Sequence, residues 1–467
     1  MIQASIRKAE SLAELNVLRE DIATWQDYWE DSGAVQAHRT QLTLLIDVLD
    51  AVITDIEEWA RNEFDLAADA GQAYAACGKA DKLTLHARRL WRWYADKIDQ
   101  LRDEPTSPEE RTVRAADELI WSCWKTAWTH LGTGETPAAP IPYLEAEFAA
   151  SATPRDRVPQ GIRPGDADEL LKKHIALLPI PVIALPSACT RRPWWLIVAA
   201  HETGHLVQDQ LTLVQDTVLD LERNAGDDAD LWGTWGPELF ADAFSVLLAG
   251  PAAIWAIAEL EMRADLNYLP AGLSLYPPPL VRVEVANEVA RQAGITGYDP
   301  GFPPAPHDDQ IARLVAHAPS VATTLLGLLS GSGQEPNALG TQTADAFKPG
   351  GSIAIWRDNL LSNETPLTER SQSGARFCAC AGVAAWQGIA RDVAARQRLT
   401  GTDLGEPELL AEADRLAERV LLALPDCAEP ATRAAARARK AAGEGEISNY
   451  LARQIFEGML HDEGEYR

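Results

Sequence analysis

The stretch 193–211, PWWLIVAAHETGHLVQDQL, decides the fold of the central part of the chain. Pro193 suits the first turn of a helix, where its fixed backbone angle fits and its missing amide is not needed. The residues that follow it are apolar and uncharged as far as Ala200. His201 and His205 are four residues apart, so a helix presents both imidazoles on one face. We therefore predict a buried helix carrying two side chains that can bind one ion.

The segment from His201 to His205 has the pattern H-E-x-x-H. Zinc accepts two imidazoles and a carboxylate in tetrahedral geometry and leaves its fourth position for water. Glu202 stands beside the first histidine and is a candidate general base for that water. Burying these groups without partners would be costly. A bound zinc ion therefore explains the apolar surroundings better than two satisfied core histidines do.

The third ligand separates the classes of H-E-x-x-H protein. Metzincins require a glycine and a histidine where this chain has Gln208 and Leu211, so that class is excluded. Further along, Pro237 predicts the start of a second helix with Glu238 in its first turn. Glu238 and Asp242 are four residues apart and face the same way. Glu238 can bind the metal while Asp242 accepts a hydrogen bond from the far nitrogen of a ligand histidine.

These two segments resemble the gluzincin metallopeptidases, in which H-E-x-x-H is followed by E-x-x-x-D on a later helix. The matching sequences here are HETGH at 201–205 and ELFAD at 238–242. The resemblance covers about 120 residues, roughly 175–295, and implies a zincin-like peptidase core. It also implies that Glu202 is the general base and that Asp242 orients His201. The implied zinc ligands are His201, His205 and Glu238.

A second, shorter resemblance concerns 276–283, which reads YPPPLVRV. The CAAX-type and heat-shock membrane endopeptidases of the gluzincin group carry H-P-P-x-x-x-R-I after the E-x-x-x-D helix. The prolines and Arg282 match, while Tyr276 replaces the histidine. Tyr276 is therefore a candidate hydrogen-bond donor to the oxyanion, and Arg282 is a candidate for the site lining. A tyrosine that only caps a proline-rich turn fits equally well, and His307 and His317 are rival donors.

Apolar periodicity and loop-forming residues divide the chain into four predicted parts. Residues 1–131 predict a four-helix bundle that binds the substrate or a regulatory protein partner. Residues 132–165 are rich in Gly, Thr and Pro and predict a linker. The peptidase core is expected at 166–300, with an edge strand at 180–185 because prolines surround that stretch. Residues 301–467 predict a helical C-terminal region. The predicted fold class is therefore mainly α with a small sheet or edge strand.

Two segments are predicted to act on the substrate, one by gating the site and one by holding the peptide. Glycines in 224–236 predict a loop between the ligand helices, in which Trp232 and Trp235 cover and gate the site. The predicted edge strand at 180–185 can hold an extended peptide by main-chain pairing.

Composition excludes several classes of partner and compartment. A net charge of -27 repels nucleic acid and anionic membranes. The sequence lacks a clean apolar run of about 20 residues, so we expect no membrane insertion. Six scattered cysteines and the lack of a signal-peptide pattern predict a cytoplasmic protein. Arginine outnumbers lysine 33 to 9, which suggests a GC-rich bacterial genome.

These features predict an intracellular zinc endopeptidase, gated or narrowly specific, that acts on a protein or peptide. Two alternatives stay open. One is a zinc hydrolase or amidase with a non-peptide substrate. The other is a catalytically idle zinc-containing binding or regulatory protein, although a purely structural site has no need of Glu202.

Overall fold

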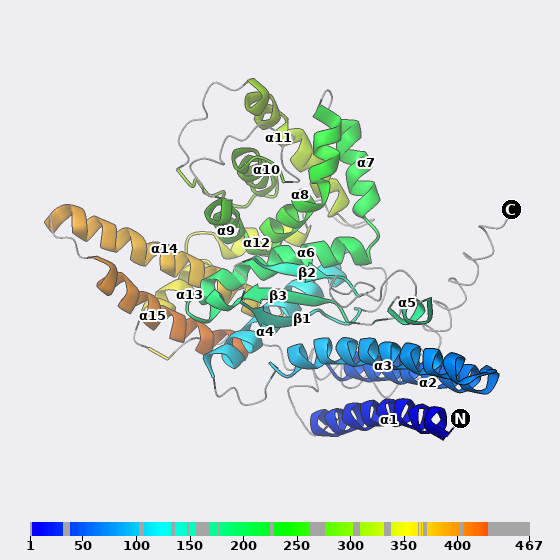
Figure 1. Cartoon of the computed structure of the whole chain (residues 1–467). Coiled ribbons are helices and arrows are strands. Elements are labelled where there is room, and N and C mark those ends of the chain that lie inside the picture. The colour runs from blue at the N-terminus through cyan, green and yellow to red at the C-terminus, as the bar shows by residue number, and fades with distance from the viewer. Residues whose placement is uncertain are drawn as a thin grey trace.

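The computed structural model shows a mainly α-helical protein with one small sheet, which confirms the predicted fold class (Figure 1). Helices surround the sheet on both sides, and a pair of long helices extends from one end of the molecule. The described residues are 2–30, 38–101, 107–131, 136–146, 149–155, 169–175, 178, 180–224, 228–261, 276–301, 309–330, 338–362, 364–365, 367, 371–400 and 405–427.

The N-terminal helices α1 (Ile2–Glu30), α2 (Arg39–Leu66) and α3 (Ala70–Ile98) pack against one another. Helix α4 (Pro108–His130) begins with a capping box at Ser107 but packs mainly on the body of the protein. The expected four-helix bundle is therefore wrong, because α4 contributes its apolar face to a different core. Apolar periodicity shows that a face is buried and does not show which partner covers it.

The sheet consists of β1 (Ile141–Glu145), β2 (Ser151–Thr153) and β3 (Val182–Pro186) in the order β1-β3-β2. Strand β3 runs parallel to β1 and antiparallel to β2. The expected edge strand at 180–185 is thus the central strand, and the expected linker at 132–165 supplies both edges. The prolines misled the prediction because Pro181 stands directly before β3 and Pro186 is its last residue, so neither interrupts the middle of the strand.

The sheet separates two apolar cores. Val182 and Ala184 of β3 pack with the three N-terminal helices, while Ile183 and Leu185 pack with the larger core of the body. This alternation follows from the two-residue period of a strand. The N-terminal helices are therefore joined to the body through a buried face of the sheet.

The segment after β3 passes through η2 (Ser187–Thr190) and η3 (Pro193–Ile197) into α6 (Val198–Gln210). Helices α7 (Val214–Asn224) and α8 (Ala229–Ala249) follow and lie side by side. The helix predicted after Pro193 is thus present, with a tight first turn.

Most of the predicted loop at 224–236 is helical, because α8 covers 229–236, while 225–227 lie outside the described residues. Gly233 and Gly236 lie inside this helix, and a Cβ atom at Gly233 would meet the Glu222 carboxylate of α7 at 2.6 Å. A Cβ atom at Gly236 would make only ordinary contacts of 3.4 Å with Leu221 and Thr217, so both glycines lie within the packed helix rather than in a loop. Pro237 lies inside α8 and does not begin it. Trp232 and Trp235 are fully buried in the core, so they do not cover the site as predicted.

The remaining elements complete the body. Helices α10 and α11 pack together, as do α13 and α14, and α14 also packs on α15. Their bounds, with those of α5, α9, α12 and η5, are α5 (Glu169–Ile175), α9 (Pro251–Glu261), α10 (Pro279–Gln292), α11 (Asp309–Leu328), α12 (Ala338–Ala346), α13 (Ser352–Leu361), α14 (Gly374–Thr400), α15 (Gly405–Ala423) and η5 (Leu424–Cys427).

Helices α11–α15 agree with the helical prediction for the C-terminal region, of which 428–467 lies outside the described residues. Among the described helices, α11 alone has the length and apolar composition needed to cross a membrane. Core helices pass the same test, and 39% of its apolar window is buried inside the protein.

Candidate metal centre

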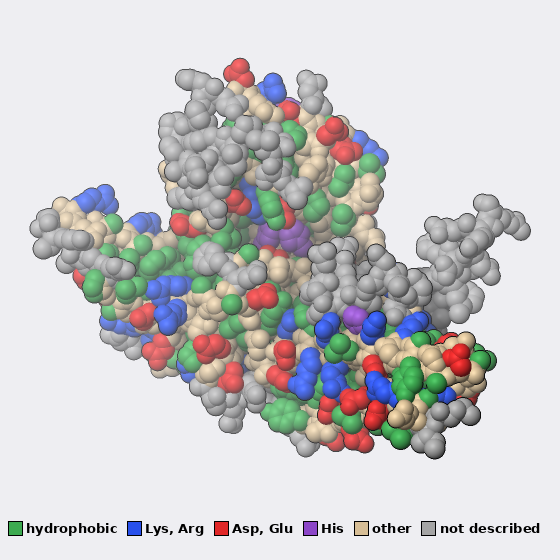
Figure 2. Space-filling model, viewed as in Figure 1, with side chains coloured by type: hydrophobic (Ala, Val, Ile, Leu, Met, Phe, Trp, Pro, Cys, Tyr) green, Lys and Arg blue, Asp and Glu red, His purple; other side chains and the backbone are tan. Residues whose placement is uncertain are grey.

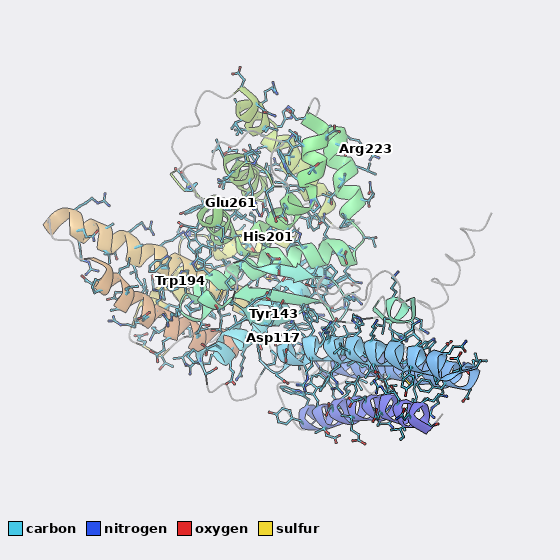
Figure 3. All side chains as sticks on the ribbon, viewed as in Figure 1. Asp117, Tyr143, Trp194, His201, Arg223 and Glu261 are labelled. Atoms are coloured by element: carbon cyan, nitrogen blue, oxygen red, sulfur yellow. The ribbon has the colours of Figure 1, made fainter. Side chains whose placement is uncertain are left out.

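Helix α6 brings the two histidines of the H-E-x-x-H sequence together. The Nε2 atoms of His201 and His205 lie 3.1 Å apart. Both side chains are partly exposed. Figure 2 shows histidine side chains at the surface of a hollow, at the place where Figure 3 labels His201. The site is therefore open to a ligand from outside.

Helix α8 supplies the third candidate ligand. Glu238 Oε2 lies 3.4 Å from His201 Nε2, and Glu238 Oε1 lies 3.5 Å from His205 Nε2. This approach depends on Gly204, since a Cβ atom there would lie 2.9 Å from the Cα atom of Ala241 on α8. The small residue inside HETGH thus lets the two ligand helices touch.

The three ligand atoms fit a zinc ion. Tetrahedral bonds of 2.0–2.1 Å place ligand atoms about 3.3 Å from one another. The separations here are 3.1, 3.4 and 3.5 Å. Within the described part of the chain, His201, His205 and Glu238 form the one group of His, Cys, Asp and Glu side chains that could hold a metal ion. Two imidazoles and one carboxylate are also the donor set that zinc prefers.

Asp242 lies behind His201, one turn after Glu238 on α8. Its Oδ1 atom is 2.8 Å from His201 Nδ1, and its side chain is almost fully buried. Burial alone would raise the pKa of Asp242, but Arg282 and His201 outweigh it and hold the pKa well below its usual range. A carboxylate in this place fixes the ring of His201 so that Nε2 points to the other ligand atoms.

Arg282 of α10 connects the acidic groups of the site. Its Nε donates to Asp242 Oδ2 at 2.7 Å, and its Nη2 donates to Asp242 Oδ1 at 3.0 Å and to Glu238 Oε2 at 3.3 Å. Its Nη1 donates to Glu261 Oε1 at 2.8 Å. Arg282 thus lies beside the ligand set, as its match to the proline-arginine segment led us to expect. Glu261 was absent from the sequence prediction because no motif contains it.

Burial and neighbouring charges shift the pKa values of all three candidate ligands. Burial alone would lower the pKa of His201, but Asp242 and Glu238 outweigh it and raise the pKa to about 10. Burial and the neighbouring His201 lower the pKa of His205 to about 4. Burial alone would raise the pKa of Glu238, yet the two histidines and Arg282 lower it. The carboxylates of Asp242 and Glu238 therefore favour positive charge on the His201 ring.

Glu202 faces the strand at the edge of the sheet. Burial raises its pKa to about 7, and the charge of His201 opposes that rise, as does, to a smaller extent, a hydrogen bond from the backbone amide of Ala152 on β2. A carboxylate with a pKa near neutrality can both accept and return a proton. Ala152 was missed by the sequence prediction because β2 has only three residues and lies in the expected linker.

The structure describes two of the three predicted oxyanion donors, Tyr276 and His317. Tyr276 is 48% exposed, and its ring centre lies 6.0 Å from the guanidinium carbon of Arg282. Glu238 and then burial raise the pKa of Tyr276, so this tyrosine belongs to the electrostatic surroundings of the site. His317 lies on α11, and His307 lies outside the described residues.

A small apolar pocket lies at the start of α6. Val198 lines it one turn before His201 on α6, and Ala150 lines it directly before β2. The remaining lining residues are Pro186, Ala188, Cys189, Trp195 and Leu260.

Comparison with protein-family models, with curated proteins and with solved structures found no match to this chain. The likeness to gluzincins therefore depends on the two sequence motifs and on the geometry described above.

Proposed function

We propose that the chain is an intracellular zinc-dependent endopeptidase. The observation that carries this proposal is the placement of three ligand atoms at 3.1, 3.4 and 3.5 Å from one another beside a buried glutamate. His201, His205 and Glu238 would hold the ion. When bound, zinc would polarise the carbonyl of the scissile bond and acidify a water molecule.

The chain's own residues would move the proton. Glu202 would take it from the attacking water and deliver it to the nitrogen of the leaving amine. The amide of Ala152 would orient the Glu202 carboxylate through the hydrogen bond that it donates. Asp242 and Arg282 would keep His201 and Glu238 in place during both steps.

The surroundings favour a peptide over a small amide. Strand β2 pairs with β3 along one edge and has no other partner in the described sheet. An extended peptide can pair with such an edge through its main chain. The apolar pocket beside Val198 would receive one of its side chains. This arrangement moves the proposed substrate strand from β3, where we first expected it, to β2.

Elemental analysis of purified protein tests the metal site first. We expect about one zinc per chain in the wild type and in Glu202→Gln, and loss of zinc in Glu238→Ala. Asp230→Ala, an exposed acid on the same helix, is the matched control and should keep zinc. A library of unstructured peptides should then be cleaved by the wild type and left intact by Glu202→Gln. Zinc-loaded wild type that cleaves no peptide would contradict the proposed activity.

A further inference from the structure

The guanidinium of Arg282 donates hydrogen bonds to carboxylates on two sides. Its side chain is only 9% exposed and contacts carboxylates on two different helices. Nε and Nη2 face Asp242 and Glu238 on α8, whereas Nη1 faces Glu261 on α9. Figure 3 labels Glu261 and His201, whose elements α9 and α6 lie in the same part of the molecule. One planar guanidinium therefore joins the last residue of α9 to the candidate ligand set.

The contact from Glu261 fixes how the guanidinium is turned. The two bonds to Asp242 set the plane of the fork, and the Nη2 bond to Glu238 is the longest of the four at 3.3 Å. A small rotation of the fork would break that longest bond first. Glu261 opposes such a rotation because it holds the opposite nitrogen at 2.8 Å.

We propose that Glu261 is a positioning residue of the metal centre, acting through Arg282 to keep Glu238 and Asp242 in the geometry that binds the ion. This inference rests on the zinc site of the proposed function and is independent of whether a peptide is cleaved. Glu261 itself touches no ligand atom in the contacts described, so its effect on metal affinity must pass through Arg282.

Zinc affinity measured by competition with a chelating dye tests the proposal, with thermal unfolding followed in parallel. We expect Glu261→Ala to weaken zinc binding by about tenfold, the lower end of the effect found for residues that hold ligands in place. Glu261→Gln keeps an oxygen that can accept from Nη1, so it should weaken binding by less than about threefold. Glu259→Ala removes an exposed acid from the same helix and should leave the affinity unchanged.

A double-mutant cycle shows whether Glu261 acts through Arg282. Arg282→Lys keeps the charge and loses the fork. In that background Glu261→Ala should have almost no further effect on zinc affinity. An equal tenfold loss in both backgrounds, equal losses for the Ala and Gln variants, or no loss at all would overturn the proposal. Zinc binding without peptide cleavage would overturn only the peptidase activity, while a wild type that binds no zinc would overturn the metal site and this inference together.

Discussion

Replacing Gly204 by alanine should weaken metal binding at the candidate metal centre, although Gly204 is not one of the candidate ligands. The new Cβ atom would lie 2.9 Å from Ala241 Cα, 3.1 Å from Phe244 Cδ1 and 3.2 Å from Ala241 O. Two of these three atoms belong to the backbone of α8, so a side-chain rotation cannot relieve the clash. Helices α6 and α8 must separate by some tenths of an ångström, which moves the histidines away from Glu238.

The magnitude follows from two opposing effects. Overpacking a well-packed core costs about 1–3 kcal/mol. Alanine inside a helix gains about 1 kcal/mol over glycine. Because the clash is with backbone, we place the cost at the upper end and expect the free energy of unfolding to fall by about 1–2 kcal/mol.

Gly78 is the matched control for this substitution. It lies exposed on α3, and a Cβ atom there would have no neighbour within 4 Å. Gly78→Ala should therefore raise the free energy of unfolding by up to about 1 kcal/mol. Urea unfolding of the zinc-free variants measures both values, and dye competition measures zinc affinity, which should fall at least about tenfold in Gly204→Ala only. A Gly204→Ala protein that is as stable as Gly78→Ala and binds zinc normally would refute the close-packing explanation.

Three further outcomes are expected. Asp242→Asn should weaken zinc binding about 10–100-fold, measured by dye competition, because asparagine cannot supply the charge that holds His201. The kcat/KM of the wild type should fall as the pH drops below the pKa of Glu202, because the base must be ionised. That pKa is about 7, and a bound cation would lower it. A kcat/KM that increases below pH 6 would contradict this role. Val198→Phe should fill the apolar pocket and change which peptides are cleaved, with the zinc content unchanged, as mass spectrometry of a digested peptide library would show.

The candidate metal ligands could be proposed from sequence because helical spacing is local. His201 and His205 share a face by their separation alone, and so do Glu238 and Asp242. The structure brings the two pairs within 3.5 Å of each other. Glu261 and Ala152 carry no such signal, because each reaches the site only through the packing of a separate element.

The errors in the predicted fold have a common physical cause. Gly233, Gly236 and Pro237 are residues that usually interrupt helices, and here they lie within α8. Helix α8 packs along α7 over this stretch, and burial of its apolar residues outweighs the helix-breaking tendency of the three residues. The central position of β3 was equally hidden, since its partners come from 141–153 and one of them has only three residues. Tertiary contacts, which local patterns do not encode, decided both cases.

The charges around the site give the strongest physical reason for a bound cation. Glu202, Glu238, Asp242 and Glu261 surround one guanidinium, that of Arg282, and two imidazoles. Burial of several carboxylates against a single arginine is unfavourable unless further positive charge is present. Raising the pKa of His201 to about 10 and that of Glu202 to about 7 supplies such charge as protons. A divalent ion held by His201, His205 and Glu238, as we propose, would supply it without protonating Glu202 and would leave that carboxylate free to act as a base.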